Sequence, residues 1–553
     1  MIRAILFFVL LAPFSLAATS GWAAEVYGID FPDGVFSAET WGGGLDAKAE
    51  GVILYGAQMP SWPKSVPIDL NFRDSCGLVI ANIDGDPDLE IVVATSGETL
   101  HAWDHDGTLI FEKDITGLAQ TIAAVGDVVG DDAPEIVVGT RDAVGGTPTP
   151  TLYVFSGDGT ILFSGQAAHG GAMGQPVTLA DVAGDEKLEI IVGESGSQTG
   201  WVHVLNGDLS PAPGDWPAQL DHVPATSAAA ADIDNDGSPE IVICSFYSLY
   251  AFEVDASPMA DFPVQFDGET YSYGSPALAD FDDDGMLEIV SVTHSDNNRV
   301  HVTQYDGSEL AGWPYDLGSW SFSNPAIGDI DGDGSLEIIV GRAGGTIEDE
   351  NLFVLTAGGE DFGNFPYPMA GGAEGNFVVA DITGDADLEI IFTNNIADGG
   401  QGYLFAVDSQ AVLLDGWPLR TSGMTYLNGP TLADVDGDGH PELGALANRD
   451  DGTASVNLFT FDEYDIGLGG VHWRTYQGDD RHTGLYAPDG DDDDADDDFD
   501  DDDADDDDVD DDDADDDADD DHVDDDAADD DEQPGNADDD DDDDDSGGRC
   551  SFL

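Results

Sequence analysis

The chain has 553 residues, of which 118 are Asp or Glu and only 14 are Lys or Arg, giving a formal net charge of −104. So large a negative charge repels polyanions, which argues against nucleic acid and anionic membrane surfaces as partners. After the first segment, no stretch approaches the roughly 18 uninterrupted apolar residues of a transmembrane helix, so no membrane span is expected.

The first residues are typical of an exported protein. Met1-Ile2-Arg3 gives a short basic start, and the apolar run at 4–18 is followed by small residues. This pattern predicts a signal peptide over residues 1–24. We therefore expect the protein to be secreted or held at the cell surface, in an extracytoplasmic compartment.

Residues 25–73 form an N-terminal segment that precedes the first sequence repeat. The stretch from 51 to Trp62-Pro63 resembles the third and fourth strands of a repeat whose earlier part is missing. We expect this segment to contribute strands that close a ring by completing its last unit.

An acidic nonapeptide recurs eight times in the next part of the chain, residues 74–487, with a period of roughly 50 residues. Its fullest copy runs from Asp329 to Glu337 and leads directly into an apolar run. The eight copies begin at Asn82, Asp127, Asp181, Asp232, Asp280, Asp329, Asp381 and Asp434. Such regularity indicates one supersecondary unit that has been copied along the chain.

Each repeat contains four short strand candidates separated by turn residues. Pairs such as Asp106-Gly107 predict hairpins, because tight hairpin turns require positive φ. A sheet of this size cannot bury both of its faces alone, whereas sheets arranged around an axis cover one another. We predict an all-β fold, a β-propeller of about eight four-stranded blades, with seven blades as the alternative.

The last repeat departs from this pattern. Residues 455–460 supply its third strand, but the aromatic-Pro strand of the other repeats is missing. We expect residues 471–476 to take the place of that strand.

Aromatic-Pro pairs occur at one place in most repeats, beginning at Trp62, Trp216, Phe262, Trp313, Phe365 and Trp417. Exposed Trp faces can stack on sugar rings, so carbohydrate binding is one interpretation. A residue copied from blade to blade more often packs between blades, and we favour that interpretation.

The nonapeptide has the spacing of a calcium-binding loop. Ca²⁺ takes about six to eight oxygen ligands, and carboxylates at positions 1, 3 and 5, a glycine at 6 and a Glu at 9 supply them compactly. The positions of Cys76, Cys244 and Cys550 disfavour a disulfide framework, so a metal is the expected brace of this exported protein. We predict about four to eight structural Ca²⁺ sites.

The eight copies differ in how complete their ligand sets are. Four are complete: Asp232/Asp234/Asp236/Glu240, Asp280/Asp282/Asp284/Glu288, Asp329/Asp331/Asp333/Glu337 and Asp434/Asp436/Asp438/Glu442. The first copy keeps oxygen ligands at Asn82, Asp84, Asp86 and Glu90 but has Pro87 where glycine is usual. Three copies carry Val129, Ala183 or Thr383 at position 3, leaving the weaker sets Asp127/Asp131/Glu135, Asp181/Asp185/Glu189 and Asp381/Asp385/Glu389. For these three, weak metal binding and simple solvated turns both remain open.

The sequence at 231–243, Ala-Asp-Ile-Asp-Asn-Asp-Gly-Ser-Pro-Glu-Ile-Val-Ile, resembles the FG-GAP and VCBS-type repeats, which are related to the N-terminal β-propeller of integrin α chains. The resemblance covers about residues 74–486 and implies a calcium-braced propeller, exposed outside the cell and used in adhesion or ligand binding. The loop residues named above would carry the calcium. No Arg-Gly-Asp or metal-dependent adhesion insert is visible, so the partner stays open. Residues 473–486 also resemble the stretch that closes many bacterial proteins of this kind, which implies a bacterial origin.

Residues 488–547 form a low-complexity poly-Asp tail, and no Lys or Arg occurs from 489 to 545. This composition predicts disorder, because too little apolar surface is available to fold. A stalk that gathers cations and a solubilising linker remain alternative roles. The remnant at 548–553 contains Cys550 in a formal prenylation box, which the signal peptide contradicts; whether Cys550 belongs to a surface-anchoring signal stays open.

The residues indicate a binding module rather than an enzyme. The 11 histidines are scattered without a metal-binding spacing, and no nucleophile elbow is visible. We expect a monomeric propeller with an extracellular protein or glycan as its partner. The alternatives are a secreted polysaccharide lyase, disfavoured because such chemistry needs cationic groups that this chain scarcely has, and a purely structural surface-coat protein.

Overall fold

The structure, a computed structural model, describes residues 57–487 except for 71–76, 120, 132, 142–150, 167, 186, 197–198, 267, 272–273, 295–296, 345–348, 397–399 and 462–469. The predicted signal peptide (1–24), the Asp-rich tail (488–547), the last residues (548–553), Cys76, Cys550 and most of the N-terminal segment lie outside the described residues. Cys244 lies within them as a buried free thiol.

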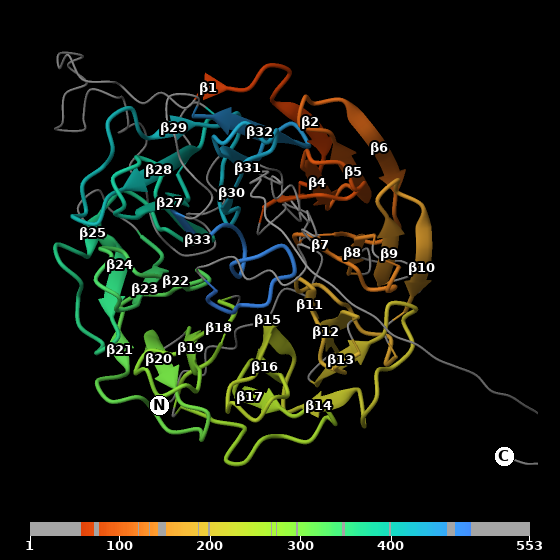
Figure 1. The fold of residues 1–553 in the computed structure, drawn as a ribbon, viewed down its shortest axis with the longest axis vertical. Coiled ribbons are helices and arrows are strands. Elements are labelled where there is room, and N and C mark those ends of the chain that lie inside the picture. The colour runs from red at the N-terminus through yellow and green to blue at the C-terminus, as the bar shows by residue number, and fades with distance from the viewer. Residues whose placement is uncertain are drawn as a thin grey trace, which may run out of the picture. The chain divides into compact units, whose positions relative to one another are not determined.

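The described residues form eight antiparallel β-sheets set as blades around an axis (Figure 1), and this part of the chain contains no α-helix. No helix there is thus long and apolar enough to cross a membrane. The predicted all-β propeller is confirmed, and the number of blades is eight rather than seven. We number the blades in the order of their acidic loops.

Blades 1 to 4 follow the chain in order. Their strands are β3 (Val79–Ala81), β4 (Glu90–Thr95), β5 (Thr99–Trp103) and β6 (Leu109–Asp114); β7 (Ala124–Gly126), β8 (Glu135–Gly139), β9 (Leu152–Ser156) and β10 (Ile161–Gly165); β11 (Thr178–Ala180), β12 (Glu189–Ser195), β13 (Gly200–Leu205) and β14 (Ala218–Leu220); and β15 (Pro224–Ala231), β16 (Glu240–Ser245) and β17 (Leu249–Phe252). In blade 4 the fourth strand is reduced to a single bridge between Leu249 and Val264.

Blades 5 to 8 continue the same plan. Their strands are β18 (Ala277–Ala279), β19 (Glu288–Val292), β20 (Arg299–Thr303) and β21 (Tyr315–Asp316); β22 (Ala326–Gly328), β23 (Glu337–Gly341), β24 (Glu350–Thr356) and β25 (Tyr367–Pro368); β26 (Phe377–Ala380), β27 (Glu389–Thr393), β28 (Tyr403–Val407) and β29 (Leu419–Arg420); and β30 (Pro430–Ala433), β31 (Glu442–Asn448) and β32 (Thr453–Thr460).

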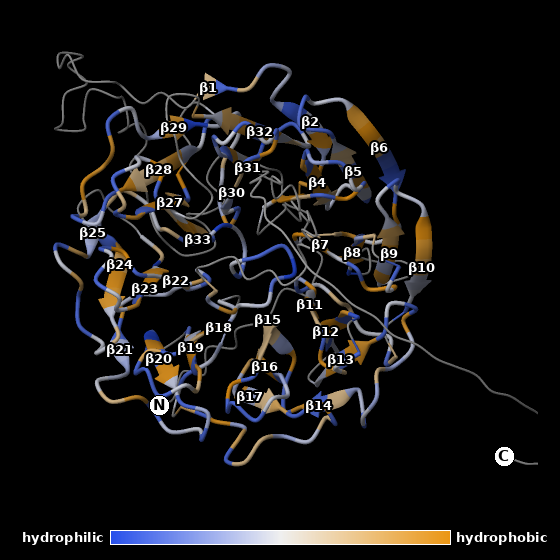
Figure 2. Ribbon diagram, in the orientation of Figure 1, coloured by the Kyte–Doolittle hydropathy of each residue, from blue (hydrophilic) through white to orange (hydrophobic). Residues whose placement is uncertain are grey.

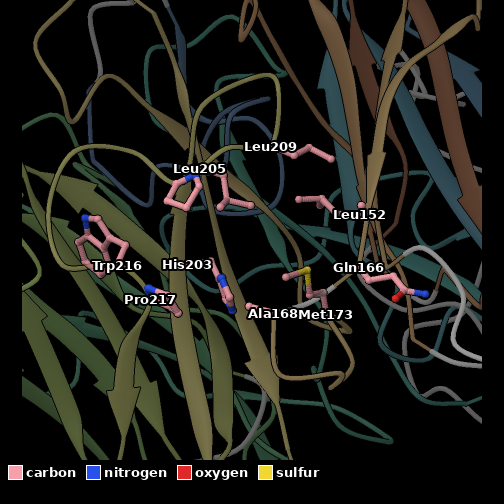
Figure 3. A pocket seen from close by; sticks show the side chains of 11 residues that line it. Leu152, Gln166, Ala168, Met173, His203, Leu205, Leu209, Trp216 and Pro217 are labelled. Carbon is pink, nitrogen blue, oxygen red and sulfur yellow. The ribbon is translucent and has the colours of Figure 1, made fainter. Parts of the chain in front are cut away.

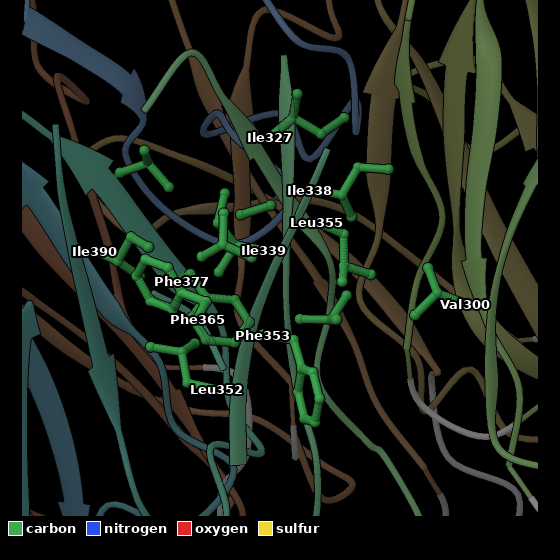
Figure 4. Packing of buried hydrophobic residues seen from close by; sticks show 14 of the residues in the cluster. Val300, Ile327, Ile338, Ile339, Leu352, Phe353, Leu355, Phe365, Phe377 and Ile390 are labelled. Atoms are coloured by element: carbon green, nitrogen blue, oxygen red, sulfur yellow. The ribbon is translucent and has the colours of Figure 1, made fainter. Parts of the chain in front are cut away.

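The core lies between the blades. In the second strands an initial Glu is followed by a continuous apolar run, as in β23, because the neighbouring blades cover both faces of each sheet. Figure 4 shows this packing: Phe353 of blade 6 lies in one cluster with Val300 of blade 5 and Ile390 of blade 7. Figure 2 shows the same division across the ring, with apolar strands and polar connections.

The ring is closed by strands from opposite ends of the described chain. β1 (Ala57–Gln58) and β2 (Lys64–Pro67) both pair with β32 of blade 8, with Ala57 opposite Thr460 and Lys64 opposite Val456. Blade 8 is therefore assembled from the N-terminal segment and the last repeat together.

Residues 471–476 do not replace the missing strand of blade 8, and that prediction is wrong. β33 (Val471–Trp473) instead pairs with β26, the innermost strand of blade 7, with Trp473 opposite Val379. The outer position in blade 8 is already taken by β1 and β2. Trp473, at 2 % exposure, is buried in the apolar cluster that spans blades 5 to 7.

Residues 470–486, which we call the central segment, run through the middle of the ring, where they are drawn in blue in Figure 1. Backbone N–H groups of six blades donate to its carbonyl oxygens over 2.7–2.9 Å: Val125 to Asp480, Leu179 to Arg481, Ala230 to Thr483, Leu278 to Gly484, Asp381 to Gly470 and Leu432 to Arg474. The axis of the propeller is thus filled by this chain's own backbone.

Candidate metal centre

All eight acidic loops lie at one end of the ring, because each connects the innermost strand of a blade to the second strand. Neighbouring loops touch in pairs. The residue at position 8 donates its backbone N–H to a carbonyl of the preceding blade's loop in four cases: Leu89 to Val435, Leu188 to Asp127, Leu287 to Ile233 and Leu388 to Ile330. Three other loops have a proline there, Pro134, Pro239 or Pro441, which has no N–H to donate.

The Glu at position 9 has the same geometry in every loop. One of its carboxylate oxygens accepts the backbone N–H of position 2 over 2.9–3.1 Å, in all eight copies. This Glu is also the first residue of the second strand, and it is at most 3 % exposed in each blade. A buried carboxylate thus ties the start of each loop to the strand that follows.

The burial of these eight glutamates raises their pKa. Desolvation is the main cause, and the nearby loop aspartates add repulsion, so that the pKa of Glu90, Glu135, Glu240 and Glu288 is raised to about 7 and that of Glu337, Glu389 and Glu442 to about 8. The pKa of Glu189 is raised for the same reasons. Both burial and repulsion disfavour the ionised form of these carboxyls.

The other predicted ligands are less enclosed than the Glu at position 9. The residue at position 1 is half-buried in all eight loops. At position 3, Asp234 and Asp436 are half-buried, whereas Asp84, Asp282 and Asp331 are exposed. The aspartate at position 5 is exposed in every loop: Asp86, Asp131, Asp185, Asp236, Asp284, Asp333, Asp385 and Asp438.

Burial thus decreases from position 9 through position 1 to position 5. The spacing in the sequence had instead suggested four equivalent metal ligands at positions 1, 3, 5 and 9. The cause of this decrease is the turn, which projects from the end of the blade and returns to the packed sheet only at position 9. A cation held by such a loop would be open to solvent on the side of position 5, and it would keep water among its ligands there, as Ca²⁺ often does.

The aspartates at position 5 also support the turn themselves. In seven loops the side chain accepts the backbone N–H of position 7 over 2.9–3.3 Å, and the acceptors are Asp86, Asp185, Asp236, Asp284, Asp333, Asp385 and Asp438. This bond occurs both in the complete loops and in loops that lack an acid at position 3. The residue type at position 5 therefore has a structural use in the turn besides the predicted metal binding.

The four complete loops share one turn. The carboxylate at position 1 accepts the N–H of position 5 over 3.0–3.2 Å and that of position 6 over 2.8–2.9 Å. The glycine at position 6 has a φ of 86–93°, a backbone conformation that side-chain-bearing residues disfavour. Position 4 is also left-handed, but there Asn235 and Asp283 adopt it as well as glycine does.

The first loop folds differently from the complete loops. Its position 1 amide oxygen, from Asn82, accepts the N–H of Gly85 at position 4 over 2.8 Å. The same bond to position 4 occurs in the three loops that lack an acid at position 3, from Gly130, Gly184 and Gly384 over 2.5–2.6 Å. Pro87 has no N–H to offer from position 6, but the bond to position 4 does not depend on this proline. The loop of blade 7 makes it and also keeps a bond from position 6, in which Ala386 donates to Asp381 over 3.0 Å. Asp84, Asp86 and Glu90 nevertheless present oxygens within 4.8 Å of one another.

In the three loops without an acid at position 3, the residue at that position donates a further hydrogen bond to the Glu at position 9. The backbone N–H groups of Val129 and Ala183 donate to Glu135 and Glu189 over 3.1 and 2.9 Å. The hydroxyl of Thr383 lies 3.5 Å from Glu389. In Glu135 and Glu189 the acceptor is the same oxygen, Oε2, that already accepts the N–H of position 2. These loops therefore offer a cation fewer oxygens because position 3 has no carboxylate, and not because of the added bonds.

The complete loops fit a hard cation by a separate criterion. Asp234 Oδ1, Glu240 Oε1 and Asp436 Oδ1 are buried oxygens without a hydrogen-bond partner. Oxygens of Asp232, Asp234 and Asp236 lie within 4.8 Å of one another, as do those of Asp280, Asp282 and Glu288. A buried carboxylate oxygen that accepts nothing is costly, whereas bound to Ca²⁺ it would be satisfied. The residues present therefore fit Ca²⁺.

The aromatic rings of the aromatic-Pro pairs are all buried, at 8 % exposure or less. The indole N–H of Trp313 in blade 5 donates to the carbonyl of Ala357 in blade 6 over 2.9 Å, and Trp216 in blade 3 reaches Val254 in blade 4 over 3.1 Å. These rings pack between blades, and their faces are not available to stack on a sugar.

One cluster was not visible in the sequence. The structure brings together His169, Glu194 and His203, with oxygen and nitrogen atoms within 4.8 Å of one another. The spacing of these residues along the chain matches no metal motif, so no sequence pattern could have found them.

Comparison with known proteins agrees with this architecture. Residues 181–243 and 280–340 match the model of the FG-GAP-like repeat family, so that the matched stretches contain the loops of blades 3 to 6. The chain is thus a β-propeller that carries FG-GAP-like repeats. No curated protein sequence matches it.

Solved structures show the fold alone. The Vibrio cholerae biofilm matrix protein Bap1 has a TM-score of 0.52 at 14 % identity, with 79 % of this chain and 96 % of that chain covered. BamB from Moraxella catarrhalis gives 0.44 at 15 % identity over 73 % of this chain and 100 % of that chain. The C-terminal domain of Pseudomonas aeruginosa PilY1 has a TM-score of 0.38 at 11 % identity, with 67 % of this chain and 93 % of that chain covered.

Proposed function

We propose that this propeller binds Ca²⁺ through its acidic loops and acts outside the cell as an adhesion or ligand-binding module. The observation that carries the calcium proposal is the pair of unsatisfied buried oxygens in the loop of blade 4, Asp234 Oδ1 and Glu240 Oε1. They belong to positions 3 and 9 of one loop, and in blade 8 Asp436 Oδ1 at position 3 is unsatisfied as well.

Bound Ca²⁺ would neutralise carboxylates that now repel one another. In each complete loop the acids at positions 1, 3, 5 and 9 would hold it, and the ion would join the turn to the first residue of the second strand. Because loops of neighbouring blades are hydrogen-bonded, as Leu287 is to Ile233, an ordered loop would also hold the adjacent blade. Calcium is therefore proposed as a brace of the ring.

The proposal assigns the loop acids to metal binding and keeps none for acid–base catalysis, so we propose a binding module and not an enzyme. The partner we propose is an extracellular protein or glycan, bound by a monomeric propeller. The predicted signal peptide supports the extracytoplasmic location.

Thermal unfolding with and without a chelator tests the calcium brace. We expect the midpoint of the full chain to fall by several degrees in chelator and to return with added Ca²⁺ but not with Na⁺ of equal ionic strength. Asp234→Asn should reduce the calcium-dependent gain, whereas Asp131→Asn in a loop without an acid at position 3 should change it little. A midpoint that does not respond to calcium would refute the brace.

Glycan and protein arrays test the binding role separately. The calcium-loaded protein should retain a reproducible set of ligands and should not cleave uronate polymers. Depolymerisation of a polyuronate, measured by release of unsaturated ends, would contradict the proposal and favour a lyase.

A further inference from the structure

A second group of possible metal ligands lies far from the loop end of blade 3. Glu194 is near the end of β12, His203 is on the neighbouring strand β13, and His169 is in the connection between β10 and β11. His203 pairs with Val192, two residues before Glu194, so the two side chains are diagonal neighbours on one face of the sheet. His203 Nε2 lies 2.7 Å and His169 Nδ1 lies 3.2 Å from the same oxygen, Glu194 Oε2.

The carboxylate is held in place from its other side. Glu194 Oε1 accepts the backbone N–H of Gly171 over 2.7 Å and that of His169 over 3.0 Å. The ring of His169 stacks on Trp201 with a centroid distance of 3.9 Å and an interplanar angle of 10°. The N–H of His169 also lies 3.3 Å from Oε2. Backbone and indole thus fix the orientation of Glu194 and His169 without using either of the imidazole nitrogens that point at Oε2.

The side chains of Glu194 and His203 are 0 % and 4 % exposed, and that of His169 is 37 % exposed. The group is therefore open to solvent only at His169. Burial lowers the pKa of His203, and although burial alone would raise that of Glu194, the hydrogen bonds from Gly171, His203 and His169 hold it below its ordinary value.

A similar group in blade 5 shows what the first one lacks. There His301 donates to Glu269 and Glu309 over 2.8 and 2.6 Å, and Arg299 pairs with Glu269 over 3.2 Å. The blade 5 carboxylate thus has an internal cation. Among the described residues, the ion-pair partners of Glu194 are two histidines and no Lys or Arg.

We propose that His169, Glu194 and His203 bind a divalent transition-metal ion of the zinc class. Two imidazole nitrogens and one carboxylate oxygen are donors that Zn²⁺, Co²⁺ and Ni²⁺ prefer over Ca²⁺, unlike the all-oxygen loops. Ligand atoms bound to such an ion at about 2.0–2.2 Å lie roughly 3–3.5 Å apart. The 3.2 Å between His169 Nδ1 and Glu194 Oε2 is in this range, and the 2.7 Å between His203 Nε2 and Oε2 would lengthen slightly as the ion replaces the shared proton. The site is distinct from the calcium loops and does not depend on the function proposed for them.

Three protein ligands leave a fourth coordination position for water or another donor. His203 also lines a cavity of about 250 Å³ with mostly apolar walls, among them Met173, Leu205 and Trp216 (Figure 3). The cavity places apolar surface beside one of the metal ligands.

Cobalt titration of the full chain in excess Ca²⁺ tests this site, because Ca²⁺ occupies the oxygen loops while Co²⁺ bound by nitrogen gives visible absorption bands. We expect one such site per chain, from which one equivalent of Zn²⁺ displaces Co²⁺. His169→Ala should weaken binding at least tenfold, and its partly exposed position leaves folding intact. Glu194→Gln, whose amide keeps an oxygen for Gly171, should do the same, with circular dichroism to verify its fold.

The matched control is His105→Ala. His105 lies 2.7 Å from Asp104 and 3.1 Å from Asp88, a rival group beside the first acidic loop. This variant should bind Co²⁺ as the wild type does. The proposal is overturned if the wild type gives no bands, if His169→Ala binds with unchanged affinity, or if His105→Ala alone removes the signal.

Discussion

At the scale of single residues, the most informative group is the Glu at position 9. It is buried in all eight blades, it accepts the N–H of position 2 in all eight, and its pKa is raised in all eight. The sequence predicts this residue as a ligand from its spacing alone. It cannot show that Glu240 is left with one satisfied and one unsatisfied oxygen while Asp236 of the same loop faces solvent, because that depends on what the packed blade excludes.

Glu240→Gln should therefore have opposite effects with and without calcium. The amide oxygen can still accept the N–H of Ile233, but the buried charge is gone. In chelator at pH 8 we expect the variant to be more stable than wild type by about 1 kcal/mol, and in calcium less stable by about 1–2 kcal/mol. Urea unfolding in both buffers measures this crossover. Glu112→Gln, on the exposed side of β6, should show none.

Gly334→Ala tests the turn of a complete loop without any change in charge. Gly334 has a φ of 91°, and a Cβ added there would meet no atom within 4 Å, so the cost comes from the backbone conformation alone. We expect a loss of about 1–2 kcal/mol in urea unfolding with calcium present. Gly332→Asn should be nearly neutral, since Asn235 occupies the equivalent position with a φ of 57°. Equal losses in both variants would contradict this account.

At the scale of elements, the repeat pattern of the sequence predicts which strands form but not always where they pair. Residues 471–476 have the composition of a strand, yet β33 joins blade 7 because β1 and β2 already occupy the outer edge of blade 8. The turn of the first loop was equally open. Pro87 shows that this turn cannot have a bond from position 6. Only the structure shows that Asn82 accepts the N–H of Gly85 at position 4, as the first residue does in three loops without this proline.

The central segment is the element whose contribution to stability is most direct to test. The hydroxyl of Tyr476, 1 % exposed, lies 2.6 Å from Ser227 Oγ and 2.7 Å from Ser275 Oγ, in blades 4 and 5. Tyr476→Phe should cost about 1–3 kcal/mol, because two buried hydroxyls lose a partner that water cannot replace. In the control variant Tyr486→Phe, the hydroxyl that is removed contacts the half-buried His472. Its free energy of unfolding, measured in urea or by heating, should fall less than that of Tyr476→Phe.

At the scale of the whole molecule, eight buried carboxyls with raised pKa act together. The ring places eight acidic loops at one end, so repulsion within and between them accumulates when no cation is bound. The fold class and the regular recurrence of the acids follow from the sequence, because a period that strict admits few architectures. The sequence left eight or seven blades, and the structure has eight. The grouping of His169, Glu194 and His203 does not, because it depends on how one connection lies against blade 3.

The stability of the calcium-free protein should fall as pH rises from 6.5 to 8. An ordinary Glu has a pKa near 4.5 and those of the loops are raised to about 7–8, so in this range the folded chain binds more protons than the unfolded chain and loses this advantage as they leave. Buried His294 and His482, whose pKa is lowered to about 4, act in the opposite direction, and their effect fades as the pH rises from 6.5 to about 7.5, where the unfolded histidines lose their protons. Thermal midpoints in chelator across this range measure the slope.

Saturating calcium should remove most of this pH dependence, because the cation holds the carboxylates in their charged form. A slope that is the same with and without calcium would show that the loop glutamates are not the titrating groups.

The pairing of β1 and β2 with β32 in blade 8 sets the order in which the ring can be completed during synthesis. Gln58 hydrogen-bonds to Leu458, 400 residues further along the chain, and the apolar surface of Trp62 and Val66 is covered by Val456 and Leu458. Blades 1 to 6 and the four strands β26 to β29 of blade 7 can pair from contiguous chain as they emerge. β1 and β2 are synthesised early, but their partner β32 is synthesised only after seven blades have been made. The growing chain therefore exposes the apolar edge of β1 and β2 until blade 8 has been translated.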